Sequence, residues 1–110
     1  MSDVFKAIAD PTRRQILMTL AKGPENVNSI SEKFDMSRPA VSKHIKILTE
    51  SNLVRIEIDR VDTRQRNCHA QFEALQEVNE YLRRLEEFWS NKLVGLEKFL
   101  KNQNKKPDNK

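Results

Sequence analysis

Residues 29–51 read SISEKFDMSRPAVSKHIKILTES, and this stretch predicts two helices joined by a tight turn. Apolar side chains at helical spacing place the first, short helix over about 28–34. Asn26 or Asn28 is expected to cap it. Residues 35–37 leave room only for a tight connection, so the second helix begins almost at once.

The second helix, predicted over 37–51, has one apolar and one polar face. Ser37 is its expected N-cap, and a proline in the first turn is tolerated there. Val41, Ile45 and Leu48 recur at i, i+4 and i+7, which predicts a buried stripe. At about 100° per residue, the opposite face carries small, polar and charged residues: Pro39, Ser42, Lys43, Lys46 and Glu50.

Two further helices are expected before this pair. One covers 3–9, and the other runs from Pro11 to about Ala21, with Asp10 as its N-cap. Gly-Pro at 23–24 ends the second of them.

The hydrophobic period changes to two after the helix-forming stretch. Val54, Ile56 and Ile58 alternate with charged residues, which predicts a half-buried strand. Residues 60–64 are expected to form a polar turn, and 65–70 a weaker returning strand.

One long helix is predicted over 73–100. It would be about 42 Å long, so its own chain is not expected to cover all of its apolar stripe. Residues 101–110 are polar and are expected to be a disordered basic tail. The apolar side chains of the helix follow a spacing of three and four residues, close to a coiled-coil seam: Leu75, Val78, Leu82, Leu85, Trp89, Leu93, Leu96 and Leu100.

Length and composition exclude several classes of protein. The 110 residues fit one domain, expected over 1–100. A single cysteine, Cys68, excludes an internal disulfide and a multi-cysteine metal cage. The chain has no apolar run of about 18 residues and no signal-peptide pattern, so a cytoplasmic protein without a membrane segment is expected. With 2 Gly and 2 His, and no catalytic grouping, neither an enzyme nor a bound cofactor is expected.

The net charge of +4 is unevenly distributed. Residues 1–36 are neutral, 37–66 carry +3, 67–100 carry −2 and 101–110 carry +3. The basic middle block suits a polyanion, although the total charge alone is a weak signal.

The order of elements predicts a mainly α fold with a small β-hairpin, a winged helix-turn-helix. An α-helix fits the major groove of B-DNA, and helix 37–51 offers the side chains that the groove accepts. The hairpin at 53–70 would bring its arginines to phosphates or to the adjacent minor groove. The expected contacts with double-stranded DNA are Ser37, Arg38, Pro39, Ser42, Lys43, His44, Lys46, Arg60, Arg64 and Arg66.

Two motifs resemble the ArsR family of bacterial winged-helix repressors. Residues 9–17, ADPTRRQIL, are similar to the family's opening motif, and residues 36–45, MSRPAVSKHI, to its recognition helix. Residues 48–54 are similar to its exit into the wing, and the resemblance covers about 3–100.

The resemblance implies a homodimer that represses transcription from an inverted-repeat operator. In the family the first and last helices form the dimer, so the long C-terminal helix is expected to be a dimerisation helix. The residues expected at the dimer interface are Val4, Phe5, Leu82, Leu85, Trp89, Leu93 and Leu96.

The sequence departs from the family pattern in two places. Residues 29–36 lack the metal-sensing cysteines, and the last helix has no histidine, so no metal site is expected. The wing turn has no glycine and is longer than usual, and its Asp59 and Asp62-Thr63-Arg64 are similar to the MarR family instead. The resemblance therefore implies the subgroup that lacks metal-sensing cysteines, with a MarR-like regulator as an alternative.

Basic residues at the helix junctions have a structural alternative to DNA contact. His44 could contact phosphate or pack at the edge of the motif. Arg13 and Arg14 could reach phosphates, or form ion pairs with acidic residues of the chain.

Three other residues favour a structural role. Cys68 and His69 are neighbours on the returning strand and point to opposite faces, so they are a poor metal chelate. Cys68 is more typical of a buried apolar thiol than of a redox switch. Trp89 is more typical of a dimer core than of a ligand platform.

A second function class stays open, that of a winged helix that binds proteins and never meets DNA. Such a module would expose large apolar side chains on the outer face of helix 37–51, where this chain has Ser42, Lys43 and Lys46. The sequence does not identify an effector. A small organic molecule and a protein both stay open.

Overall fold

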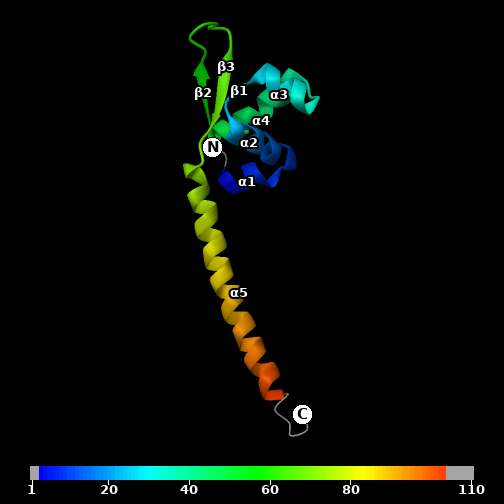
Figure 1. The fold of residues 1–110 in the computed structure, drawn as a ribbon, viewed down its shortest axis with the longest axis vertical. Helices are drawn as coiled ribbons and strands as arrows, with labels where there is room; N and C mark the ends of the chain where they lie inside the picture. The colour runs from blue at the N-terminus through cyan, green and yellow to red at the C-terminus, as the bar shows by residue number, and fades with distance from the viewer. Residues whose placement is uncertain (1–2, 104–110) are drawn as a thin grey trace. The chain divides into compact units, whose positions relative to one another are not determined.

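The computed structural model describes residues 3–103 of the chain (Figure 1). It confirms the predicted winged helix-turn-helix order and adds one short strand that the sequence did not predict. In chain order the elements are α1 (Val4–Ala9), α2 (Pro11–Lys22), β1 (Glu25–Asn26), α3 (Val27–Phe34), α4 (Arg38–Glu50), β2 (Val54–Ile58), β3 (Arg66–Ala70), η1 (Glu73–Leu75) and α5 (Gln76–Gln103).

The chain divides into a compact winged-helix unit, residues 3–78, and the remainder of α5, residues 79–103. The long helix extends to Gln103, three residues beyond the predicted end at Leu100. Residues 104–110 of the expected tail lie outside the described residues. Within residues 3–103, no helix combines the length and apolar character needed to cross a membrane.

Two arginines of α2 donate hydrogen bonds to the free carbonyls at the end of the short helix α1. The last four carbonyls of a helix have no partner within it. Arg13 donates to the carbonyls of residues 6–7 at 3.2 and 2.8 Å, and Arg14 to those of residues 8–9 at 2.8 and 3.2 Å. Both guanidinium groups therefore serve the fold through hydrogen bonds to backbone carbonyls, a role that the sequence did not predict.

The sheet has three antiparallel strands in the order β1-β3-β2. Ile56 of β2 and Glu25 of β1 pair with Cys68 from opposite sides, so β3 is the central strand. Two residues are too few for an alternating pattern, so β1 could not be predicted from hydrophobic periodicity. This strand joins the chain before α3 to the root of the wing.

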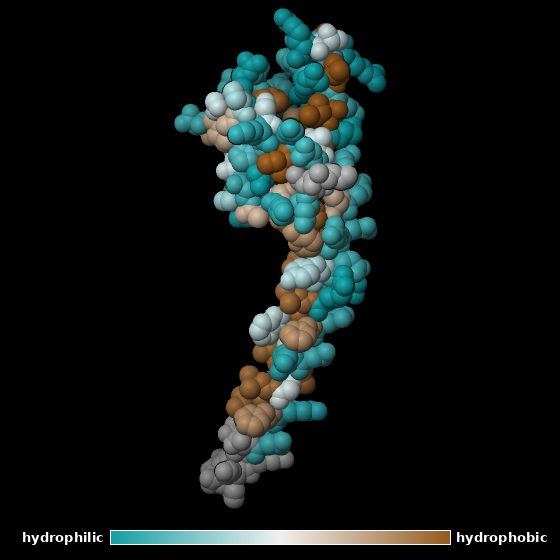
Figure 2. Space-filling view, turned by 180° about the vertical axis from the view of Figure 1, so that it is seen from behind, coloured by the Kyte–Doolittle hydropathy of each residue, from teal (hydrophilic) through white to brown (hydrophobic). Residues whose placement is uncertain are grey.

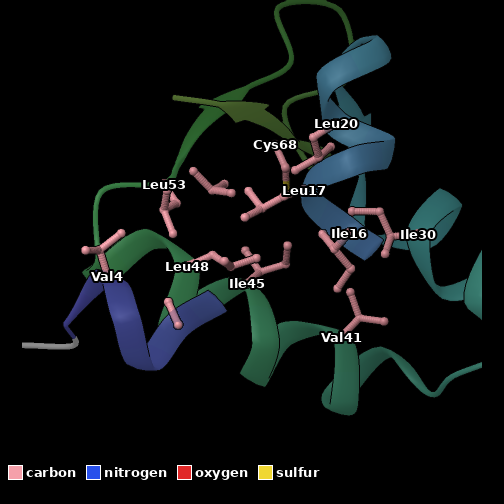
Figure 3. Close-up of a cluster of buried hydrophobic side chains, with 12 residues drawn as sticks. Val4, Ile16, Leu17, Leu20, Ile30, Val41, Ile45, Leu48, Leu53 and Cys68 are labelled. Atoms are coloured by element: carbon pink, nitrogen blue, oxygen red, sulfur yellow. The ribbon is translucent and has the colours of Figure 1, made fainter. Parts of the chain in front are cut away.

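The core lies between the helices and the inner end of the sheet (Figure 3). Side chains from α2 and α4 meet at its centre, and Val4, Leu53 and Cys68 close it from the other elements. The predicted inward faces of α2 and α4 are confirmed, because these side chains are all buried: Ile16, Leu17, Leu20, Val41, Ile45 and Leu48.

The prediction of a half-buried β2 holds only at its inner end. Val54 is buried, but Ile56 is 36% and Ile58 56% exposed. The hairpin extends beyond the core, so alternation continues where no helix covers the strand. Periodicity identified the strand correctly but overstated its burial.

Cys68 and His69 point to opposite sides of β3, as expected for neighbours on a strand. Cys68 is fully buried, and its burial raises the pKa of the thiol to about 11. The His69 Nε2 lies 3.3 Å from the Glu57 Oε1. Among residues 3–103 no three potential ligands gather in a way that could hold a metal ion.

The carboxylate of Asp10 is the N-cap of α2, and its removal should destabilise the fold. Its Oδ2 accepts from the backbone N–H of Arg13 at 3.0 Å. This hydrogen bond, helped by the nearby Arg13 guanidinium, lowers the pKa of Asp10 below its ordinary value of 3.8. Asp10→Ala should lower the free energy of unfolding by about 1 kcal/mol at neutral pH in urea titrations.

The stabilisation by Asp10 depends on pH in one direction. A lowered folded-state pKa means that the stabilisation by Asp10 is present above pH 3.8 and is lost as the pH falls through the lowered value. Asp10→Asn is the control, because asparagine also caps a helix but carries no charge. It should keep most of the stability at neutral pH and lose the pH dependence that comes from Asp10. Equal stability of wild type and Asp10→Ala at neutral pH would contradict this role.

The buried thiol of Cys68 should react slowly in the native protein. The thiolate is the reactive form, and a pKa of about 11 leaves little of it at neutral pH. Labelling with a disulfide reagent should be complete in urea and should lag far behind in native buffer. Equal labelling rates in the two conditions would show that the thiol is accessible and would reopen a redox role.

Candidate nucleic-acid interface

The candidate interface begins with the rotation of α4 about its own axis. Val41 and Leu48 are fully buried, and Ile45 is only 3% exposed. Figure 3 shows these side chains pointing from α4 toward those of α2. The opposite face is exposed at every predicted position: Pro39, Ser42, Lys43, Lys46 and Glu50.

The first turn of α4 is fixed by a capped start after a tight turn. The Ser37 Oγ accepts from the backbone N–H of Ala40 at 3.2 Å, as predicted for the N-cap. Asp35 adopts a left-handed conformation with φ 52°, which aspartate tolerates better than most residues. The Ser31 hydroxyl donates to the carbonyl of Met36 and holds the turn against α3. Arg38 is exposed next to the cap.

The other end of α4 has a Schellman motif, which sets the exit into the wing. Asn52 has φ 63°, and its N–H donates to the Thr49 carbonyl at 3.0 Å. The N–H of Leu53 donates to the Leu48 carbonyl at 2.9 Å. Because Leu53 is fully buried, this turn directs the chain from the helix into β2.

His44 lies at the junction of α4 with the first two helices. Its Nδ1 is 3.2 Å from the Arg13 Nη1 and 4.0 Å from the Asp10 Oδ2. Both neighbours belong to the first two helices, so the Nδ1 side of the ring faces the interior of this junction. One ring nitrogen of His44 is therefore engaged within the chain, by Arg13 and Asp10.

The wing is a hairpin whose tip is ordered by two aspartates. The Asp59 carboxylate accepts from the N–H of Val61 at 2.9 Å, and the Asp62 carboxylate accepts from the N–H of Arg64 at 3.1 Å. Such side-chain turns replace the missing glycine. The hydrogen bonds from the Arg64 side chain and N–H lower the pKa of Asp62.

All three predicted wing arginines are exposed. Arg64 is held by Asp62, with 3.1 Å between its Nε and the Oδ1. Within residues 3–103, Arg60 and Arg66 form no ion pair, so their charges face solvent.

A groove of about 550 Å³ separates the wing from the start of α4. One wall comes from the first turns of α3 and α4, and the other from residues 64–66. None of the lining residues carries a carboxylate, and three are arginines, so the groove favours an anion. The residues around it are Asn26, Val27, Asn28, Arg38, Pro39, Ser42, Arg64, Gln65 and Arg66.

The expected dimer residues fall into two groups. Val4 is a core residue of its own unit, 6% exposed, and has little surface left for a partner, whereas Phe5 is half-buried. The others lie on α5, where Figure 2 shows brown and tan side chains gathered along one side, with paler residues between them. All of these side chains are exposed: Leu82, Leu85, Trp89, Leu93 and Leu96.

Sequence reasoning missed the side-chain pairs that join distant segments. Asn26 was expected only as a helix cap, yet its Nδ2 also donates to the Gln65 Oε1 at 3.1 Å. The sequence predicts for Gln65 only a place at the start of the returning strand. The pairing of His44 with Arg13 was missed in the same way, because neither pair leaves a local pattern.

The comparisons with known proteins agree on one family. The model of the bacterial regulatory protein arsR family matches residues 10–55. The chain is 44% identical over 54 residues to the transcriptional repressor SdpR of Bacillus subtilis. That match covers 49% of this chain and 60% of SdpR, so it spans less than two thirds of this relative.

Solved structures extend the likeness over most of the chain. A crystal structure of an ArsR family transcriptional regulator has a TM-score of 0.70 and 36% identity, and the match covers 79% of this chain and 87% of that one. An ArsR-like transcriptional regulator from Rhodococcus sp. RHA1 has a TM-score of 0.70 at 26% identity, covering 87% and 88% of the two chains. On the match at 36% identity, together with the helix-turn-helix geometry, the chain belongs to the ArsR family of bacterial regulatory proteins.

Proposed function

We propose that the chain is a homodimeric DNA-binding transcription regulator that represses from an inverted-repeat operator. The observation that carries this proposal is the exposed face of α4, where Ser42, Lys43 and Lys46 lie opposite a fully buried aliphatic stripe. The family and the named repressor SdpR support the regulatory role.

In this proposal α4 enters the major groove. Lys43 and Arg38 donate to the O6 and N7 acceptors of guanine, and Ser42 is short enough to let the backbone approach the bases. Lys46 contacts phosphate, and Ser37 and Pro39 place the helix N-terminus beside the DNA backbone. His44 contacts a phosphate from the edge of the same face.

The wing supplies contacts outside the major groove. Arg60, Arg64 and Arg66 are exposed on the hairpin, and their charge suits phosphates or a narrow minor groove. These contacts strengthen binding and fix the register, while α4 reads the sequence.

A dimer is needed to read two half-sites. Two copies of α4 would enter successive major grooves about 34 Å apart on one face of the DNA. The exposed apolar band of α5 is the surface that a second copy of the chain would cover. Large exposed apolar bands of this kind mark interaction sites.

A protein-binding module is the weaker alternative. None of the large exposed apolar side chains among residues 3–103 lies on α4, although such side chains would be expected on a protein-docking face. The family match also favours the ArsR over the MarR assignment. We place the regulator in the cytoplasm, where bacterial DNA lies, under the control of an organic ligand or a partner protein.

Replacing Lys43 or Ser42 tests the reading face. Lys43→Ala should weaken operator binding about tenfold or more, because it removes one base contact. Ser42→Glu should abolish binding, because it sets a carboxylate against the DNA. Gel shifts with a duplex selected in vitro, repeated at rising salt, measure both effects.

The matched controls lie on α2, away from this face. Lys22→Ala removes a lysine, and Gln15→Glu adds one negative charge at an exposed position. Both proteins should bind as wild type does. Operator binding by Ser42→Glu at wild-type affinity would overturn the assignment of α4.

A lysine in the apolar band of α5 tests the dimer. Leu85→Lys or Trp89→Lys should yield monomers in sedimentation, because a desolvated charge at the interface is costly. Operator binding should then fall steeply, since a monomer reaches only one half-site. Asn91→Lys is the control, because residue 91 lies on the opposite side of the same helix. Unchanged dimers in Leu85→Lys and Trp89→Lys would refute this interface.

A further inference from the structure

We propose that Asn26 and Gln65 are positioning residues for DNA binding. Their side chains join the wing to the first turn of the helix-turn-helix motif, so that wing and recognition helix face DNA in one fixed arrangement. This inference rests on the proposed function, because it assigns to one hydrogen bond the geometry of the same interface.

Asn26 holds two elements with one side chain. Its Oδ1 accepts from the backbone N–H of Ser29 at 2.8 Å and caps α3. Its Nδ2 donates to the Gln65 Oε1 at 3.1 Å. Because the cap fixes the orientation of the amide, the Nδ2 is directed toward the wing before any DNA binds.

Gln65 closes the wing at its root. Its carbonyl accepts from the N–H of Asp59 at 3.0 Å, and its own N–H donates to the carbonyl of Asp62 at 2.9 Å. The backbone of this residue thus ties together both sides of the loop at 59–65. A side chain anchored to Asn26 therefore restrains the whole tip.

The strand β1 supports the hydrogen bond between the Asn26 and Gln65 side chains, called the tether below, but does not replace it. Asn26 pairs with Asn67, next to the root of the wing, and Glu25 pairs with Cys68 in the core. The strand ends at Asn26, so no further backbone ladder joins the loop at 59–65 to α3. The amide pair extends the connection from Asn67 to Gln65, two positions earlier in the chain.

The basic groove explains why this connection matters for binding. Arg38 lies on its helical wall, and Arg64 and Arg66 lie on its wing wall, with the tether between Asn26 and Gln65 part of its lining. A phosphodiester held by both walls needs them at a constant separation. If the wing were mobile, it would lose conformational entropy on binding DNA, and this cost would weaken the affinity.

The experiment breaks the tether from each side in the full-length protein. Gln65→Ala removes the acceptor, and Asn26→Ser removes the donor but keeps a good N-cap for α3. Each variant should weaken operator binding about tenfold, and the double variant should be no weaker than the single ones. Arg66→Ala should cost less affinity in the Gln65→Ala background than in wild type.

Two readouts separate positioning from simple loss of structure. Hydroxyl-radical footprints should lose protection at the wing flanks and keep it over the major groove that α4 occupies. In the protein without DNA, NMR order parameters of residues 59–65 should fall toward about 0.6 or below in Gln65→Ala, while those of α4 stay near 0.85. Gln15→Ala, a glutamine on the exposed face of α2, is the matched control.

The outcomes distinguish this inference from the proposed function. If wild type binds no duplex in a selection experiment, the proposed function fails, and with it the role in DNA binding. If wild type binds, but Gln65→Ala keeps the affinity, the footprint and the wing order of wild type, the positioning role is wrong. Uniform loss of the footprint together with disorder of α4 would also overturn it, because the pair would then only stabilise the fold.

Discussion

Val41, Ile45 and Leu48 pack into the core beneath α4, and their burial fixes the rotation of the helix about its axis. Burying side chains of this size contributes about 1.5–3 kcal/mol each, far more than a surface contact. A turn of the helix by one residue position would expose the stripe, so Ser42, Lys43 and Lys46 cannot turn inward. The geometry of the candidate interface is therefore a consequence of core packing. The surface residues supply the chemistry but do not decide where it lies.

Most of the helical framework could be predicted from the sequence, because its signals are local. The predicted caps at Asp10 and Ser37 are confirmed, and so are the buried faces of α2 and α4. A cap needs one side chain within three residues, and a buried face needs a repeat of 3.6, so both leave a readable pattern. The left-handed Asn52 was not predicted, although it too is a local feature that ends α4 within its own turn.

The contacts that join separate segments could not be predicted in this way. Arg13 and Arg14 complete α1 through backbone carbonyls, and a carbonyl is present in every residue, so it leaves no mark in the sequence. Asn26 and Gln65 meet across 39 positions of chain, and their pairing depends on how β1 lies beside β3. Periodicity also overstated the burial of Ile58, because it reports alternation and cannot report where the core ends.

The two units of the chain have surfaces of different chemistry. The winged-helix unit has its own core and presents a basic groove without carboxylates, whereas residues 79–103 form a helix whose apolar band is exposed. Association of an apolar band is most favourable with another apolar surface, and association of a basic groove is most favourable with phosphate. Neither surface suits the partner of the other, so under the proposed function a second copy of the chain and a DNA duplex use different surfaces. Association through α5 would then present two copies of α4 without altering the packing that orients each of them.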